Sequence, residues 1–114
     1  MIKWNTLDDE AQLPAILQES ENIPVLIYKH SATCSINAMA KHRLESRWED
    51  EIRSKNYFLD LLSYRRVSNA VAELFSVTHE SPQVILVSKG KAVYHASHNG
   101  IEYRTLKKEI KKFD

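Results

Sequence analysis

Two short strand-like runs, separated by a segment of helical pattern, constrain the fold of this chain more than any other feature. The run Ile23–Tyr28 is rich in β-branched residues and almost continuously apolar, which is typical of a central strand buried on both faces. A second strand is expected at Tyr57–Leu62. Between them, apolar residues recur every three or four positions, as on one face of a long helix: Ile36, Met39, Ala40, Leu44 and Trp48. This order of strand, helix and strand predicts a parallel βαβ unit.

Two further helices are predicted on either side of these segments. Asp8 and Asp9 can cap a first helix, Pro14 fits only in its first turn, and its end is expected near Asn22. The apolar face of this helix holds Leu13, Ile16 and Leu17. After the second strand, the spacing predicts another helix with an apolar face of Val67, Ala70, Val71, Leu74 and Phe75.

The last third of the chain predicts a hairpin followed by a helix. Val84–Val87 has the pattern of a buried strand, Ser88–Gly90 that of a turn, and Lys91–His95 alternates polar and apolar residues. The final helix has an apolar stripe of Leu106, Ile110 and Phe113 beside a basic face of four lysines. The predicted order is α-β-α-β-α-β-β-α, a single α/β domain over residues 1–114 with a mixed four-stranded sheet between helices.

Charge and residue counts exclude several classes of function. A net charge of +1 is not that of a typical nucleic-acid-binding domain, and two glycines are too few for a phosphate-cradling or dinucleotide-binding loop. With one cysteine, Cys34, the chain has no internal disulfide and no cysteine-based zinc site, and no other metal site is predicted. No stretch approaches the length of a membrane span and the N-terminus lacks a leader pattern. We therefore expect a soluble, cytoplasmic protein.

The position of Cys34 is the strongest functional signal. It follows the first predicted strand across a predicted loop, Lys29–Thr33, and stands where the long helix begins. The positive end of a helix favours a thiolate over a thiol, and Lys29 and His30 can add positive potential. On the residues alone, an inert buried thiol remains the alternative, because free cysteine is among the most buried residue types.

The order of elements, the thiol at a strand-to-helix junction and Ser81-Pro82 before the hairpin together resemble the thioredoxin fold. More narrowly, the segment His30–Asn37 looks like the active-site segment of the YtxJ-type monothiol bacilliredoxins, which carry a TCPIS motif. This chain has TCSIN, from Thr33 to Asn37. The resemblance covers the whole chain, and the size and the single thiol also fit that family.

The resemblance implies a monothiol thiol–disulfide oxidoreductase that reduces protein–bacillithiol mixed disulfides through Cys34. Asn37 stands where two-thiol relatives hold a resolving cysteine, so a second thiol from outside the chain must complete the cycle, and whether a low-molecular-weight thiol or another redoxin supplies it is left open. Bacillithiol is the expected co-substrate, no cofactor is expected to be bound, and the expected partners are bacillithiolated or otherwise S-thiolated proteins. The alternative is a non-catalytic thioredoxin-like binding or redox-sensing module. The oligomeric state is left open.

Residues expected to contact the substrate follow from the same resemblance. They are Thr33, Ser35, Asn37, Ser81 and Pro82, with the Ser81-Pro82 bond expected to be cis and the main chain before it expected to pair with an extended substrate. Bacillithiol bears carboxylates, for which Lys29, Lys41, Arg65 and Arg66 are candidate contacts. The alternative for each of these cations, and for the lysines of the last helix, is an ordinary solvated face.

Overall fold

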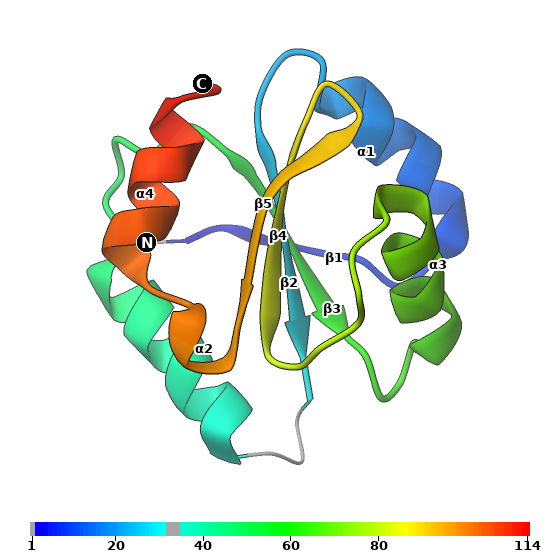
Figure 1. The fold of residues 1–114 in the computed structure, drawn as a ribbon, viewed down its shortest axis with the longest axis horizontal. Coiled ribbons are helices and arrows are strands. Elements are labelled where there is room, and N and C mark those ends of the chain that lie inside the picture. The colour runs from blue at the N-terminus through cyan, green and yellow to red at the C-terminus, as the bar shows by residue number, and fades with distance from the viewer. Residues whose placement is uncertain (1, 32–34) are drawn as a thin grey trace.

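A mixed sheet lies between two pairs of helices in the computed structural model, which describes residues 2–31 and 35–114, with the backbone alone at residues 35–37 (Figure 1). The strands are β1 (Trp4–Thr6), β2 (Val25–His30), β3 (Lys55–Asp60), β4 (Gln83–Ser88) and β5 (Lys91–Ser97). The α-helices are α1 (Leu13–Glu19), α2 (Ser35–Arg47), α3 (Arg65–Phe75) and α4 (Tyr103–Lys111). Two short 3-10 helices, η1 (Glu10–Gln12) and η2 (His98–Gly100), complete the order.

Strand order in the sheet is β1-β3-β2-β4-β5, with β2 in the centre. β2 pairs in parallel with β3 and antiparallel with β4, and β4 pairs antiparallel with β5. The predicted βαβ unit and hairpin are therefore confirmed. The predicted count of four strands and the predicted helical start are wrong, because β1 adds a fifth strand in parallel to β3. A strand of three residues is too short to give a periodic pattern.

β2 is longer than its apolar run. Lys29 and His30, expected in a loop, continue the strand and pair with Leu59 and Asp60 of β3, and Lys29 also pairs with Gln83 of β4. The physical reason is that a strand with neighbours on both sides gains backbone hydrogen bonds at each added residue, whatever the polarity of its side chain.

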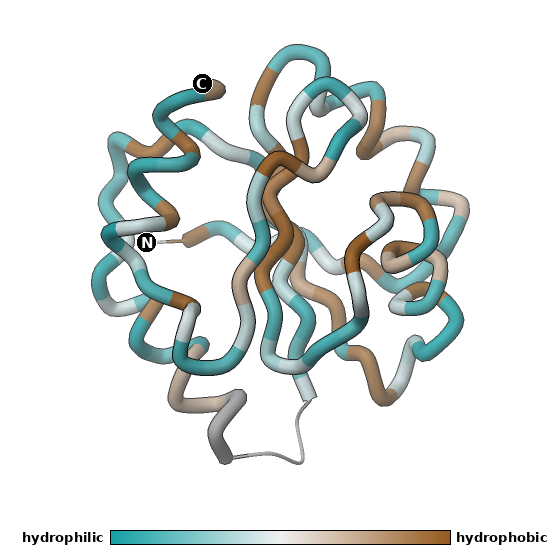
Figure 2. Tube along the Cα trace, in the orientation of Figure 1, coloured by the Kyte–Doolittle hydropathy of each residue, from teal (hydrophilic) through white to brown (hydrophobic). Residues whose placement is uncertain are grey.

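Alternate residues of the central strands fill two separate cores. Val25, Ile27 and Leu59 pack on the side of α1 and α3, while Leu26 and Tyr28 pack on the side of α2 and α4. Figure 2 shows the apolar strands at the centre of the molecule and a more polar periphery. Burying each such side chain contributes about 1.5–3 kcal/mol. The sheet is therefore held from both faces, as the continuously apolar runs predicted.

Local signals set the ends of several elements. Asp9 caps η1: its carboxylate accepts from the Ala11 N–H at 2.9 Å, and Gln12 reciprocates from inside the turn. Pro14 lies in the first turn of α1, as predicted. In the hairpin, Lys89 and Gly90 both have positive φ, at 49° and 76°, which is the geometry of the two-residue turn that joins β4 to β5.

Three residues predicted on buried helix faces are exposed instead. Met39 is 64% exposed, Leu74 43% and Phe113 38%. Met39 and Leu74 each stand one position before a residue that does pack inward, Ala40 and Phe75, and Phe113 lies beyond the end of α4. A helix resting on a sheet buries only a narrow stripe, so residues at its margin reach solvent. Among the described residues, no helix is long and apolar enough to cross a membrane.

Candidate functional site

The end of β2 and the start of α2 flank the segment that carries the thiol. β2 ends at His30 and α2 begins at Ser35, the residue directly after Cys34 in the sequence. Thr33 and Cys34 lie outside the described residues, and Ser35 and Asn37 are described only as backbone of the first turn of α2. The predicted helix start next to Cys34 is therefore confirmed, while the side-chain roles predicted for these four residues stay predictions.

Ser81 and Pro82 come to the same end of the sheet from the other half of the chain. Lys29 near the end of β2 pairs with Gln83 at the start of β4, so the two residues before Gln83 lie beside the end of β2 (Figure 1). The Ser81-Pro82 bond is cis, as the resemblance implied. The carbonyl of Pro82 accepts a hydrogen bond from the His98 N–H at 3.0 Å. The fold thus brings Ser81 and Pro82 beside the end of β2, the strand that precedes Cys34 in the sequence.

Lys29 does not face solvent at this end of the sheet. Its side chain is fully buried on the α3 side, where the ammonium donates to the Ser68 carbonyl at 3.1 Å and contacts His79 Nδ1 at 3.3 Å. Burial lowers the pKa of Lys29 to about 8. Within the described part of the chain, no carboxylate forms an ion pair with it. A contact between Lys29 and a carboxylate of a bound thiol, one of the predicted options, is therefore wrong.

His79 is a site neighbour that the sequence reasoning missed. It stands in the loop between α3 and β4, three residues before Pro82, and its Nδ1 also lies 3.3 Å from the Ser68 hydroxyl. Burial first, and then the charges of Lys29 and Arg65, lower the pKa of His79. A neutral imidazole can accept from Lys29, so the loop that carries Pro82 is tied to the central strand through this pair.

His30 occupies the opposite face of β2. Its ring is packed against the rings of Phe58 and Tyr28, with centroid distances of 5.2 Å and 6.2 Å. Burial, followed by the charge of Lys41, lowers the pKa of His30. Its Nδ1 is buried and has no hydrogen-bond partner in the described part of the chain. His30 is thus held as a neutral ring against Tyr28 and Phe58, on the side of the sheet that α2 covers.

The other candidate cations are placed differently. Lys41 forms an ion pair with Glu45 at 3.0 Å and lies over the Phe58 ring, 5.4 Å from its centroid. Arg65 and Arg66 are exposed at the start of α3, where they line a cavity of about 380 Å³ together with residues of the η1 turn. Lys41 is therefore partly neutralised, while the arginine pair is open to solvent. Among the residues described, no three metal-ligating side chains cluster.

Comparisons with known proteins identify the family and the fold. The sequence matches the family described as monothiol bacilliredoxin BrxC over residues 5–106. The solved structure of a candidate oxidoreductase with a thioredoxin fold superposes with a TM-score of 0.80 at 28% identity, over 92% of this chain and 91% of that one.

More distant thioredoxins share the fold. The proteins from Fasciola hepatica and Trypanosoma brucei brucei superpose with TM-scores of 0.73 and 0.74, at 16% and 14% identity. Each match covers 96% of this chain, and 99% and 89% of the respective thioredoxin. The predicted α/β thioredoxin-like fold is confirmed, and the family match together with the oxidoreductase neighbour supports thiol–disulfide redox function.

Proposed function

Because this chain belongs to the monothiol bacilliredoxin family, we propose that it is a thiol–disulfide oxidoreductase that reduces protein–bacillithiol mixed disulfides through Cys34. The observation that carries the proposal is the family match over residues 5–106 in a chain whose only cysteine directly precedes α2. A thiol–disulfide oxidoreductase reacts through a cysteine, and this chain has one, so Cys34 is the proposed reacting group.

The proposed reaction is one thiol–disulfide exchange. The Cys34 thiolate attacks the bacillithiol sulfur of the mixed disulfide, the S–S bond between bacillithiol and the substrate cysteine breaks, and the substrate protein leaves as a thiolate that takes a proton from water. Cys34 then carries bacillithiol in a new disulfide. A second low-molecular-weight thiolate attacks this disulfide, frees Cys34 and becomes oxidised itself. With Asn37 three residues after Cys34, the chain has no second cysteine to do this internally.

The electrostatics around α2 support a reactive thiolate. The first N–H groups of a helix are unpaired and lie at the positive end of its dipole, which lowers the pKa of a thiol placed there. The buried ammonium of Lys29, which forms no ion pair within the described part of the chain, adds positive charge at the strand end that leads to Cys34.

Substrate contacts are proposed on both sides of the thiol. Thr33, Ser35 and Asn37 are small or polar residues next to Cys34 in the sequence, and we propose that they contact the bacillithiol chain. Across the end of the sheet, the main chain at Ser81, before Pro82, is proposed to pair with the extended backbone of the substrate. The proposed substrates are bacillithiolated or otherwise S-thiolated proteins. We propose the cytoplasm as the compartment, since one unpaired cysteine suits a reducing environment.

Mass spectrometry of a single turnover tests this function. The protein is incubated with a bacillithiolated substrate protein, and the expected result is transfer of the bacillithiol mass to Cys34, followed by its release when free bacillithiol is added. A Cys34→Ala variant controls for non-covalent binding, and a Ser76→Ala variant, at the far end of α3, controls for substitution as such. Stable binding without transfer would contradict the proposal and indicate the non-catalytic module.

A further inference from the structure

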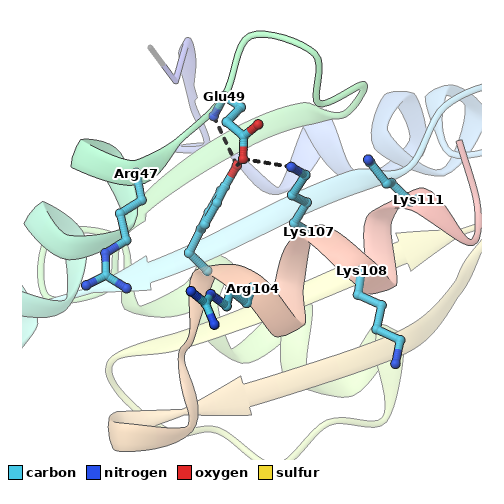
Figure 3. Close-up of a pocket in the computed structure, with 7 residues that line it drawn as sticks. Arg47, Glu49, Arg104, Lys107, Lys108 and Lys111 are labelled. Atoms are coloured by element: carbon cyan, nitrogen blue, oxygen red, sulfur yellow. Dashed lines mark hydrogen bonds and ion pairs between the residues drawn. The ribbon is translucent and has the colours of Figure 1, made fainter.

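A basic groove lies between the C-terminal end of α2 and the exposed face of α4. We use this name for the cavity of about 710 Å³ lined by Arg47, Arg104, Lys107, Lys108 and Lys111, together with Glu49 and the ring of Tyr103 (Figure 3). At a rise of about 1.5 Å per residue, Arg47 stands about 18 Å along the helix axis from Ser35, the first residue of α2. The groove is therefore separate from the proposed redox site.

Charge in the groove is only partly compensated. Lys107 forms ion pairs with Glu49 at 2.7 Å and Glu51 at 2.9 Å, and so it is neutralised within the fold. Arg47, Arg104 and Lys108 are exposed and form no ion pair within the described segments. In Figure 3 the guanidinium groups of Arg47 and Arg104 point away from Glu49. Three cations are thus available to a ligand in a chain whose net charge is only +1.

The spacing of these cations matches an extended acidic segment. Arg104 and Lys108 are four residues apart on α4, so they share a face and lie about 6 Å apart along its axis. In an extended chain, side chains on one face repeat every two residues, or about 6.6 Å. Alternate carboxylates can therefore meet Arg104 and Lys108 in turn, while Arg47 from α2 reaches the same segment from the other wall.

We propose that the basic groove docks an extended segment of a partner protein with acidic residues at alternate positions. This inference goes beyond the proposed redox function, because it uses no group at the Cys34 end of the molecule. Charge complementarity of this kind mainly speeds encounter and weakens as salt is added. The groove therefore selects among partner proteins by the acidity of their surfaces.

Other anionic partners fit the surface less well. The apolar residues of α4, which are Tyr103, Leu106 and Ile110, are buried in the core, so the helix has no apolar face to insert into a lipid surface. Nucleic acid is bound through many phosphate contacts, whereas the groove offers three cations outside ion pairs in a chain of net charge +1. A peptide carboxylate pattern avoids both difficulties, since it needs only two or three exposed cations.

Fluorescence anisotropy with defined peptides tests the docking. The probe is a short fluorescein-labelled peptide of alternating glutamate and serine, and a second peptide holds the same number of glutamates separated by two serines. We expect the first peptide to bind more tightly, with an affinity that falls as salt is raised from low to physiological concentration. Equal binding of the two peptides overturns the proposed register on Arg104 and Lys108.

Two triple variants separate the groove from net charge. The groove variant is Arg47→Gln, Arg104→Gln and Lys108→Gln, and the matched control is Lys3→Gln, Arg53→Gln and Lys91→Gln, which removes three exposed cations elsewhere. We expect the groove variant to bind the alternating peptide about tenfold more weakly, as the loss of three exposed ion pairs predicts. Both variants should keep Cys34-dependent transfer from a small disulfide, so this test stands apart from the proposed function.

Two outcomes overturn the docking proposal. In one, the control variant loses as much affinity for the alternating peptide as the groove variant, which assigns binding to overall charge. In the other, vesicles of anionic lipid bind the wild-type protein while the peptide does not, which assigns the basic groove to a membrane surface.

Discussion

The ammonium group of Lys29, on the central strand, lies 3.3 Å from Nδ1 of His79, in the loop that leads to Pro82. This contact joins residues fifty positions apart in the sequence, and a second bond from the same ammonium reaches the Ser68 carbonyl on α3. A fully buried lysine held by neutral groups gives the fold a titration that can be measured.

Replacing Lys29 by methionine is expected to change how stability depends on pH. The pKa of Lys29 is about 8 in the folded protein, against about 10.4 in an unfolded chain. Between these values the unfolded chain binds more protons than the folded one, so the contribution of Lys29 to stability rises with pH. Urea unfolding measures the free energy of unfolding of both proteins. The value for wild type minus the value for Lys29→Met should increase by about 2 kcal/mol from pH 7 to pH 10. A difference that does not change with pH would contradict the buried ammonium.

Removing the carboxylate of Glu45 is expected to loosen the N-terminal edge of the sheet. Its Oε2 accepts from the Trp4 indole at 2.7 Å and pairs with Lys41 at 3.0 Å. The variant Glu45→Ala should lose about 1–2 kcal/mol, as expected for a part-buried bond to a charged acceptor. Urea unfolding measures the loss, and a red shift of tryptophan emission should accompany it. Glu73→Ala, an exposed glutamate of α3, serves as the control and should change neither quantity.

The Cys34 thiol is expected to react as a thiolate at lower pH than a free cysteine does. We expect the rate of alkylation by iodoacetamide in the folded protein to rise with pH and then level off. The midpoint of this rise, which gives the pKa of the thiol, should lie below about 8.5, the pKa of an unperturbed cysteine. Mass spectrometry across a pH series gives that midpoint. Labelling that occurs only after unfolding would indicate an inert, buried thiol and remove the basis of the proposed reaction.

A second thiol in the first turn of α2 is expected to change how the cycle ends. Asn37 stands three residues after Cys34, the spacing at which two-thiol relatives hold a resolving cysteine. In the variant Asn37→Cys, bacillithiol bound to Cys34 should be released without any added thiol, leaving an internal disulfide. Mass spectrometry distinguishes the two species. Persistence of the mixed disulfide in this variant would show that the geometry at α2 does not allow internal resolution.

The sequence predicted best what is continuous along the chain. Ile23–Tyr28 and Val84–Val87 were recognisable because both faces of β2 and β4 are buried, which requires almost unbroken apolar runs. The helix beside Cys34 was predicted from the spacing of Ala40 and Leu44, which do pack inward. The thioredoxin-like fold followed from the order of these elements rather than from any single one.

What depends on distant contacts was missed. β1 exists only because β3 offers an edge, and nothing in the three residues of Trp4–Thr6 signals a strand. Lys29 looked like a loop residue because its partner, His79, lies half the chain away. The lysines of α4 were visible in the sequence, but their grouping with Arg47 depends on how α2 and α4 pack together. The predicted roles of Thr33 and Cys34 concern residues outside the described part and stay predictions.

The central position of β2 has a consequence for when the proposed redox site forms during folding. β2 is bonded on one edge to a strand that follows it by about thirty residues and on the other to a strand that follows it by almost sixty. Closing loops of that length is slow compared with forming a helix or a local turn. A nascent chain that ends before Gln83 contains Cys34 and the residues of α2 but lacks β4, whose pairing with β2 holds Ser81 and Pro82 at the end of the sheet. The proposed exchange through Cys34 is therefore expected only after β4 has paired with β2.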